Sequence, residues 1–120
     1  MNILIADDSS LIRSRLIKLI STVPNVSVVA EAEDGEEAVQ LIQSHRPDLA
    51  ILDLRMPKLN GLEVTAHAKR NMDLKVFIVT NFYDSHSVSS AKSAGADYVF
   101  DKSSDMDVLL KFITLYAELI

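Results

Sequence analysis

The sequence predicts a doubly wound α/β fold, with five parallel strands in one sheet and five helices on its two faces. Short β-branched apolar runs alternate five times with longer segments of helical period, which is typical of a parallel sheet flanked by helices. The chain has 120 residues, of which 48% are hydrophobic, so residues 1–120 are expected to form one domain with its own core. No linker, repeat or low-complexity segment interrupts the alternation.

The five strands are predicted from short runs with the composition of buried strands. Four of the runs are mostly apolar, as expected when helices cover both faces of a sheet. The runs are residues 2–6, 26–31, 49–52, 75–80 and 98–101. Right-handed crossovers between successive parallel strands then give the doubly wound arrangement.

The first two helices are predicted from apolar residues at three- and four-residue spacing and from their caps. Ser9 or Ser10 is the expected N-cap of the first helix. Asp34 caps the second, with Glu37 three residues later, and Arg46-Pro47 ends it. Their apolar faces consist of Ile12, Leu16, Leu19, Ile20 and Val23, and of Ala38, Leu41 and Ile42.

The third helix is expected over residues 62–70 and the fourth over residues 85–94, with Gly95 closing it. Ser104 is the expected N-cap of the fifth helix, with Asp107 at the capping-box position. One face of this last helix carries Met106, Leu109, Leu110, Ile113, Tyr116 and Ile120.

The fourth helix has the weakest sequence of the five. Its serines compete for backbone hydrogen bonds, and only Val88 and Ala91 are available for burial. Two interpretations stay open: an exposed helix of indifferent composition, or an element docked loosely enough to move.

Composition excludes several classes of function. The 12 basic and 17 acidic residues give a net charge of −5, so we expect no direct binding of nucleic acid by this segment. The absence of cysteine excludes disulfides, zinc–thiolate sites and thiol nucleophiles. No apolar run resembles a signal peptide or approaches the roughly 20 residues of a membrane span. A cytoplasmic domain without a membrane partner is expected.

Three aspartates follow strands that can be neighbours in the sheet. Asp7 and Asp8 follow the first strand, and Asp53 follows the third. If these carboxylates converge, each pair at about 5 Å costs on the order of 3 kcal/mol at an effective dielectric near 20, which predicts a bound cation. Ligands that are all oxygen atoms favour Mg²⁺. The alternative is that Asp7 and Asp8 only cap the first helix and Asp53 begins a turn.

Two further strand ends carry polar side chains. Thr80 ends the fourth strand with a hydroxyl group, and Lys102 follows the fifth with an ammonium group, a suitable point charge for a phosphoryl oxygen. Each alone has an ordinary structural explanation. Together with the aspartates, they predict a site at the carboxyl edge of the sheet.

A series of motifs in this order resembles the receiver domain of two-component response regulators over essentially the whole chain. The motifs are ILIADDS at residues 3–9, EDGEEA at 33–38, PDLAILDLRMP at 47–57, Gly61, Val79-Thr80 and AGAD at 94–97, leading to Lys102. The resemblance implies the flavodoxin-like strand order 2-1-3-4-5. Some of these motifs are most similar to receivers that precede helix-turn-helix DNA-binding domains, and whether the chain is such a domain or a stand-alone receiver stays open.

The resemblance implies a phosphorylation switch. Asp53 matches the aspartate that accepts a phosphoryl group from a phosphohistidine of a sensor histidine kinase. Asp8, Asp53 and the backbone carbonyl of Arg55 would bind Mg²⁺, and Asp7 would reach the metal through water or help to position it. Lys102 would offset the charge of the phosphoryl group. Such a domain catalyses only its own phosphotransfer and dephosphorylation and is not otherwise an enzyme.

The resemblance also implies how the signal leaves the site. Thr80 would turn inward to the phosphoryl group and change the surface of the fourth helix, fifth strand and fifth helix, which controls an output or pairs with a second copy. Three positions depart from the family. Val99 replaces the usual aromatic switch residue, Ser103 the usual proline after the lysine, and Asn81 a smaller residue.

Two other classes of function remain as alternatives. A Mg²⁺-dependent phosphatase or transferase with an aspartyl intermediate would need a substrate pocket or lid, and no insertion is long enough to form one. A nucleotide-binding flavodoxin-like domain would need a Gly-rich phosphate loop, which the sequence lacks.

Overall fold

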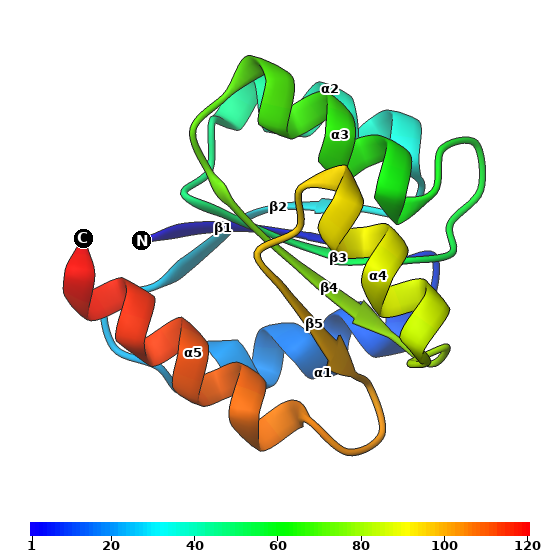
Figure 1. The fold of residues 1–120 in the computed structure, drawn as a ribbon. Coiled ribbons are helices and arrows are strands. Elements are labelled where there is room, and N and C mark those ends of the chain that lie inside the picture. Colours follow the sequence, from blue (N-terminus) through cyan, green and yellow to red (C-terminus); the bar gives the residue numbers. More distant parts are fainter.

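The computed structural model describes residues 1–120, which form one five-stranded parallel sheet with helices on both faces (Figure 1). The strand order is β2-β1-β3-β4-β5, which confirms the doubly wound fold and its flavodoxin-like order. The strands are β1 (Asn2–Ala6), β2 (Ser27–Ala32), β3 (Leu49–Asp53), β4 (Lys75–Thr80) and β5 (Tyr98–Asp101). β2 lies one residue later than predicted, and β3 extends to include Asp53.

Five helices alternate with the strands. They are α1 (Ser10–Ile20), α2 (Gly35–His45), α3 (Gly61–Asn71), α4 (Ser85–Ala94) and α5 (Met106–Leu119). α1 and α5 cover one face of the sheet, and α2, α3 and α4 cover the other (Figure 1). None of these helices is both long enough and apolar enough to span a membrane.

The core consists of two buried clusters, one on each face of the sheet. In β1, Ile3 and Ile5 join the cluster beneath α1 and α5, whereas Leu4 and Ala6 join the cluster beneath α2, α3 and α4. Successive side chains of a strand point to opposite faces, so a strand covered on both sides must be apolar throughout. Full burial of one such Ile or Leu stabilises the fold by about 1.5–3 kcal/mol.

Most helix ends follow the predicted caps. Ser9 Oγ accepts the Ile12 N–H at the start of α1, and Asp34 Oδ1 accepts the Glu37 N–H at the start of α2. Arg46 ends α2 in the left-handed conformation with φ of 47°, directly before Pro47. α1 ends at Ile20, three residues before Val23, which is nevertheless buried.

The predicted N-cap of α5 is wrong. α5 begins at Met106, so Asp105 and not Ser104 occupies the cap position. The Asp105 carboxylate does not cap the helix, because it accepts the Asp101 N–H at 2.8 Å instead. The acidic side chain of this turn therefore holds the end of β5, next to Lys102. Ile120, predicted on the apolar face of this helix, is 71% exposed.

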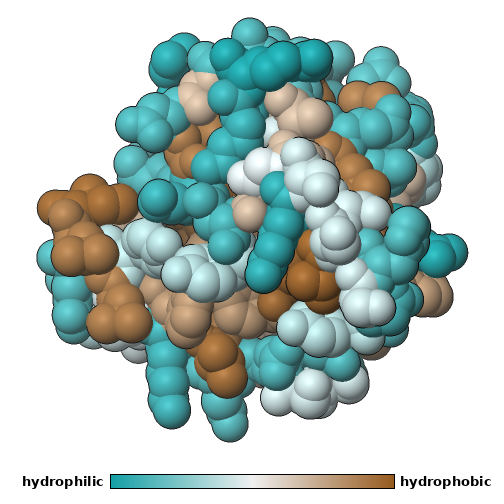
Figure 2. Space-filling model, in the orientation of Figure 1, coloured by the Kyte–Doolittle hydropathy of each residue, from teal (hydrophilic) through white to brown (hydrophobic).

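α4 packs weakly on the sheet, as its sequence predicts. Ala91 is its only buried residue, and Val88 is partly buried. Asp84 caps its start, and Gly95 ends it with a φ of 111°, in the region that favours glycine. The surface over α4 is mostly pale to teal, so little apolar area is exposed there (Figure 2).

Candidate functional site

Three aspartates meet at the carboxyl edge of the sheet, where β1 and β3 end side by side. Asp7 and Asp8 follow β1, and Asp53 is the last residue of β3. One carboxylate oxygen from each of the three residues lies within 4.8 Å of those from the other two. Asp7 and Asp53 are buried, whereas Asp8 is exposed to solvent. The structure thus brings together the three carboxylates that the sequence places at strand ends.

Lys102 brings a positive charge to these carboxylates from the loop after β5. Its Nζ lies 2.6 Å from Asp7 Oδ2 and 3.1 Å from Asp53 Oδ2, and its side chain is only 10% exposed. Its backbone N–H donates to the Thr80 carbonyl at 3.0 Å, which fixes the loop to the end of β4. One ammonium group pairs with two of the three carboxylates, so the pocket keeps an excess of negative charge.

Burial raises the pKa of the Asp53 carboxyl group; the Lys102 charge opposes this effect and the Asp7 charge adds to it. Burial alone would lower the pKa of Lys102. The hydrogen bond to Asp7 and the charge of Asp53 outweigh burial, so the Lys102 pKa is raised. Lys102 is therefore held charged, but it does not fully compensate the ionised Asp53.

Thr80 lies at the same edge, at the end of β4, the strand next to β3. Its side chain is fully buried, and its Oγ1 accepts the Phe82 N–H at 2.9 Å. Thr80 shares the edge with the aspartates and Lys102, but its hydroxyl group is engaged with the loop that leads to α4.

The loop after Asp53 folds back tightly against the strand. The Gly61 N–H donates to the Leu54 carbonyl at 2.8 Å. A Cβ atom at Gly61 would lie 2.4 Å from the Asp53 carbonyl oxygen, so only glycine allows this approach. Gly61 ends the loop that follows the PDLAILDLRMP segment, and it therefore has a steric role beside Asp53.

Arg55 makes a contact that the sequence does not predict. Its guanidinium carbon lies 3.8 Å from the centroid of the Phe82 ring, which is the geometry of a cation–π pair. Arg55 belongs to the loop after β3 and Phe82 to the loop after β4. The pair therefore joins the two loops that flank Asp53 and Thr80.

Arg13 is a second residue that sequence reasoning missed. Its Nη1 donates to the Asp7 carbonyl at 2.6 Å, and its Nε lies 3.2 Å from Glu31 Oε1. A signal was present, because Arg13 shares a helix face with Leu16 and Ile20, and a charge on an apolar face needs buried partners. These contacts tie α1 to the end of β1 and to β2.

The donor set of this pocket fits Mg²⁺. Asp7, Asp8 and Asp53 are the chain's one group of potential metal-binding residues, and they offer only carboxylate oxygens. Hard cations of this kind prefer oxygen ligands and are commonly held by one or two carboxylates plus water and phosphate oxygens. A divalent cation would also offset the excess negative charge that Lys102 leaves.

Comparison with known proteins assigns the family. A sequence model of the response regulator receiver domain matches residues 3–114. The chain belongs to this family. Among its relatives, the transcriptional regulatory protein DegU of Brevibacillus brevis is 34% identical over 119 residues. The nitrate/nitrite response regulator protein NarL of Escherichia coli K12 is 40% identical over 111 residues.

This receiver spans about half the length of those relatives. The matches cover 98% and 91% of the receiver itself, but 50% of DegU and 51% of NarL. Both relatives thus contain a comparable length of chain beyond the matched region.

Solved receivers have the same fold. A LuxR-family two-component response regulator from Aurantimonas sp. SI85-9A1 superposes with a TM-score of 0.90 at 32% identity, covering 98% of this receiver and 84% of that chain. A LuxR-family DNA-binding response regulator from Staphylococcus aureus gives 0.88 at 29% identity, with 97% and 98% covered. Phosphorylation and Mg²⁺ binding at an acidic cluster are typical of this family, and Asp7, Asp8 and Asp53 are grouped accordingly.

Proposed function

We propose that this receiver, formed by residues 1–120, is a phosphorylation-activated switch of a two-component system. Asp53 accepts a phosphoryl group from a phosphohistidine of a sensor histidine kinase. The observation that carries the proposal is the position of the Asp53 carboxylate at the end of β3, where it lies 3.1 Å from Lys102 Nζ and within 4.8 Å of an oxygen of each aspartate after β1. Response regulator receivers interact with such kinases, which supports this donor.

Mg²⁺, when bound, supplies positive charge that offsets the charge of the transferring phosphoryl group. We assign Asp8, Asp53 and the backbone carbonyl of Arg55 as its direct ligands. Asp7 reaches the metal through water or positions it, because its Oδ2 is already bonded to Lys102 and its Oδ1 accepts the Ser9 N–H. The oxygen-only donor set supports this assignment.

Asp53 acts as the nucleophile. A bond forms between a carboxylate oxygen and phosphorus as the bond from phosphorus to the histidine nitrogen breaks, and the electron pair of that bond stays on the imidazole. Lys102 Nζ, 3.1 Å from Asp53 Oδ2, is close enough to pair with a phosphoryl oxygen on that carboxylate. Water later hydrolyses the acyl phosphate. The chain has no lid for a separate substrate, so we assign it no reaction beyond its own phosphotransfer and dephosphorylation.

Thr80 connects the phosphorylated site to the surface. Thr80 Oγ1 now accepts the Phe82 N–H, and rotation of the side chain toward a phosphoryl oxygen, to which its hydroxyl would donate, moves Oγ1 away from that N–H. The loop that contains Phe82 then moves and pulls on the start of α4. Since α4 buries only Ala91, little packing opposes this movement.

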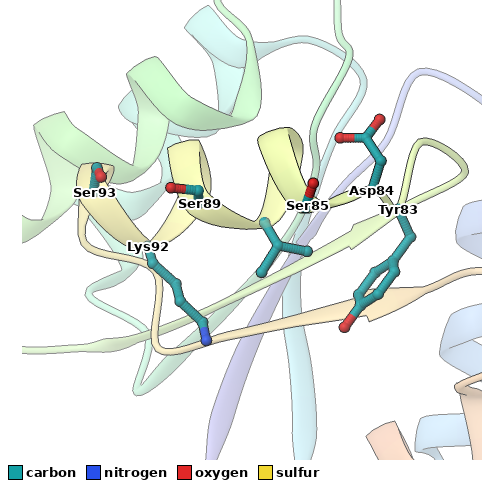
Figure 3. A pocket seen from close by; sticks show the side chains of 7 residues that line it. Tyr83, Asp84, Ser85, Ser89, Lys92 and Ser93 are labelled. Carbon is teal, nitrogen blue, oxygen red and sulfur yellow. The ribbon is translucent and has the colours of Figure 1, made fainter.

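The surface formed by α4, β5 and α5 is the proposed output. Along α4 it contains an open hollow of about 820 Å³, with Tyr83 and Lys92 toward its two ends and serines between them. The side chains of Tyr83 and Lys92 extend toward β5, whereas those of Ser85, Ser89 and Ser93 do not (Figure 3). Val99 on β5 has no ring that could swing inward, so the change in this receiver uses the backbone or other side chains.

Two further kinds of partner are considered, a second copy of the chain and nucleic acid. The sequence predicts that a second copy pairs through α4, β5 and α5, and this stays a prediction. A net charge of −5 argues against direct nucleic-acid binding by this segment. We place the protein in the cytoplasm, where sensor kinases transfer their phosphoryl groups.

The test is chemical phosphorylation. Acetyl phosphate with Mg²⁺ should add one phosphoryl group to the wild type and none to Asp53→Asn, as measured by intact mass. Asp73→Asn is the matched control, because Asp73 is an exposed aspartate without an ion pair, and it should react like the wild type. A phosphoryl group on the Asp53→Asn variant would disprove the assignment.

A further inference from the structure

The loop that joins β5 to α5 is short and carries Lys102 into the acidic pocket. It consists of residues 102–105 (Figure 1, brown to orange). The Lys102 side chain is only 10% exposed, and its Nζ reaches both Asp7 and Asp53. A lysine side chain has a flexible four-carbon stem, so its ammonium group is positioned accurately only when the backbone from which it extends is fixed. The contacts of this loop therefore bear on the charge beside Asp53.

Asp105 fixes the two ends of this loop to each other. Its Oδ2 accepts the Asp101 N–H at 2.8 Å, and its N–H donates to the Asp101 carbonyl at 2.9 Å. Both backbone polar groups of Asp101 are thus bonded to Asp105. The carboxylate makes this contact and does not cap α5, although it stands directly before the first residue of that helix. Asp105 therefore holds the loop of Lys102 and not the helix that follows it.

The Asp101 carboxylate fixes the residue that follows Lys102. Its Oδ1 accepts the Ser103 N–H at 2.9 Å and the hydroxyl group of Ser103 at 2.7 Å. Hydrogen bonds to a charged acceptor are stronger than those to a neutral one. Ser103 stands where receivers usually have a proline, and a proline has no N–H to donate to this carboxylate. Since the Lys102 N–H donates to the Thr80 carbonyl, the N–H groups of Lys102 and of both its neighbours are all bonded.

We propose that Asp101 and Asp105 are positioning residues for Lys102, and that by holding its backbone they direct its ammonium group at Asp53 and at the phosphoryl group that Asp53 accepts. This inference rests on the proposed function, in which Lys102 offsets the charge of that group. Neither aspartate forms an ion pair with Lys102, so each acts through the backbone of the loop. A charge stabilises a transferring group most when it already lies in place and needs no reorganisation during the reaction.

A second lysine provides an internal reference that separates positioning from a general contribution to folding. Lys69 Nζ donates to the Asp97 carboxylate and to the Leu74 carbonyl, each at 2.8 Å, and none of these residues belongs to the loop of Lys102. A change that weakens the whole fold would free both lysines. Loss of a positioning residue should free Lys102 alone, because the contacts of Lys69 stay intact.

The first measurement is the rate at which an amine reagent labels each lysine. The acetyl ester of N-hydroxysulfosuccinimide acetylates accessible amines, and peptide masses at successive times give the rate for each site. In Asp105→Ala, Lys102 should react about tenfold faster than in the wild type, because a hydrogen bond to a charged acceptor is lost, and Lys69 should react at its wild-type rate. Asp105→Asn keeps an acceptor oxygen and should leave Lys102 close to its wild-type rate.

The second measurement connects the position of Lys102 to the reaction. With acetyl phosphate and saturating Mg²⁺, the Asp105→Ala variant should gain its phosphoryl group about tenfold more slowly than the wild type, because a misplaced charge stabilises the transferring group poorly. Asp101→Ala should behave like Asp105→Ala in both measurements. Asp107→Ala is the matched control, because Asp107 is an exposed acidic residue in the first turn of α5, outside the loop, and it should match the wild type.

Three outcomes would overturn the proposal. One is an unchanged rate of Lys102 labelling in both Asp105→Ala and Asp101→Ala. Another is a parallel rise at Lys102 and Lys69, which would indicate a loss of folding stability and no specific positioning. The third is faster labelling of Lys102 without slower phosphorylation. A wild type that acetyl phosphate does not modify would refute the proposed function instead, and the labelling rates would still decide whether the two aspartates hold Lys102.

Discussion

Arg13 shows how a residue outside the carboxylate cluster shapes the acidic pocket. Its guanidinium group holds the Asp7 carbonyl at the point where the chain leaves β1, and pairs with Glu31 on β2. A largely buried charge is stable only when such polar partners replace water. Because the carbonyl belongs to the peptide that joins Asp7 to Asp8, Arg13 restrains both carboxylates without touching either.

The Arg55–Phe82 pair should control how long phosphorylated Asp53 survives. Phe82→Ala frees the guanidinium group that now stacks over the ring and opens the space between the two flanking loops to water. An exposed cation–π pair contributes about 0.5–1 kcal/mol. We therefore expect hydrolysis of the phosphoryl group to accelerate about 2- to 5-fold, at about 1.4 kcal/mol per tenfold change in rate.

Intact mass measured after acetyl phosphate is removed would give these lifetimes. Tyr83→Ala is the matched control, because Tyr83 is the adjacent exposed aromatic residue and does not stack on Arg55. An unchanged or longer lifetime in Phe82→Ala would rule out shielding by this pair.

The sequence identified residues whose position follows from strand ends once the strand order is known. Asp7 and Asp8 follow β1, Asp53 ends β3, and one carboxylate oxygen from each lies within 4.8 Å of the other two. Arg13 and the contact between Arg55 and Phe82 were missed for a physical reason. Their contacts depend on side-chain directions and on loop shape, which neither apolar period nor motif order specifies.

At the scale of elements, α2 and α4 differ in how firmly they pack. α2 buries Gly35, Ala38 and Ile42, whereas α4 buries Ala91 alone. Each begins with an aspartate that accepts a backbone N–H, so the caps do not explain the difference. Composition does, because the serines of α4 add no apolar area to the core.

Hydrogen exchange should report this difference. We expect the amides of α4 to exchange faster than those of α2 in the unphosphorylated protein, because local opening costs less where few apolar contacts break. Phosphorylation should slow exchange in α4 by anchoring Thr80 and the loop after it, and leave α2 unchanged. Equal protection of the two helices in both states would show that α4 is not the mobile element.

The start of α5 illustrates where element boundaries escape prediction. Ser104 is followed three residues later by Asp107, a good capping-box sequence. The adjacent Asp105 instead binds the Asp101 N–H and sets the helix start at Met106. Two local hydrogen-bond patterns are available here, a cap by Ser104 and the bond from the Asp101 N–H to Asp105. The structure has the second, which holds the end of β5 beside Lys102.

At the scale of the whole molecule, strand order decides whether a site exists. The alternation of strands and helices predicts a parallel sheet, but only the resemblance to receivers implied that β1 lies between β2 and β3. Because β1 and β3 are adjacent, the acidic turns that follow them form one pocket. The acidic surplus of the chain is therefore partly local, since three of its 17 acidic side chains are grouped in one pocket and two of them pair with Lys102.

The concentrated charge also links global stability to pH through Asp53. Its pKa in the folded protein is raised above the ordinary 3.8, so ionisation costs more in the folded chain than in the unfolded one. Below 3.8 the group is protonated in both states and this cost is absent. As pH rises through the raised pKa, the cost grows to its full value and remains at neutral pH. Lys102 is also bonded to Asp7, so replacement of Asp53 should still leave it with a carboxylate partner.

We therefore expect Asp53→Asn, without Mg²⁺, to unfold at higher urea concentration than the wild type at neutral pH. The difference should shrink as pH falls toward 3.8. At neutral pH, Mg²⁺ at a hundred times its dissociation constant should stabilise the wild type by about 2.7 kcal/mol and reduce or reverse the gap. Asp73→Asn, at an exposed position, should follow the wild type throughout. The contrary outcome is equal stability of the Asp53→Asn variant and the wild type at neutral pH without Mg²⁺. It would mean that the pocket tolerates its uncompensated charge, and the electrostatic argument for a bound cation would fail.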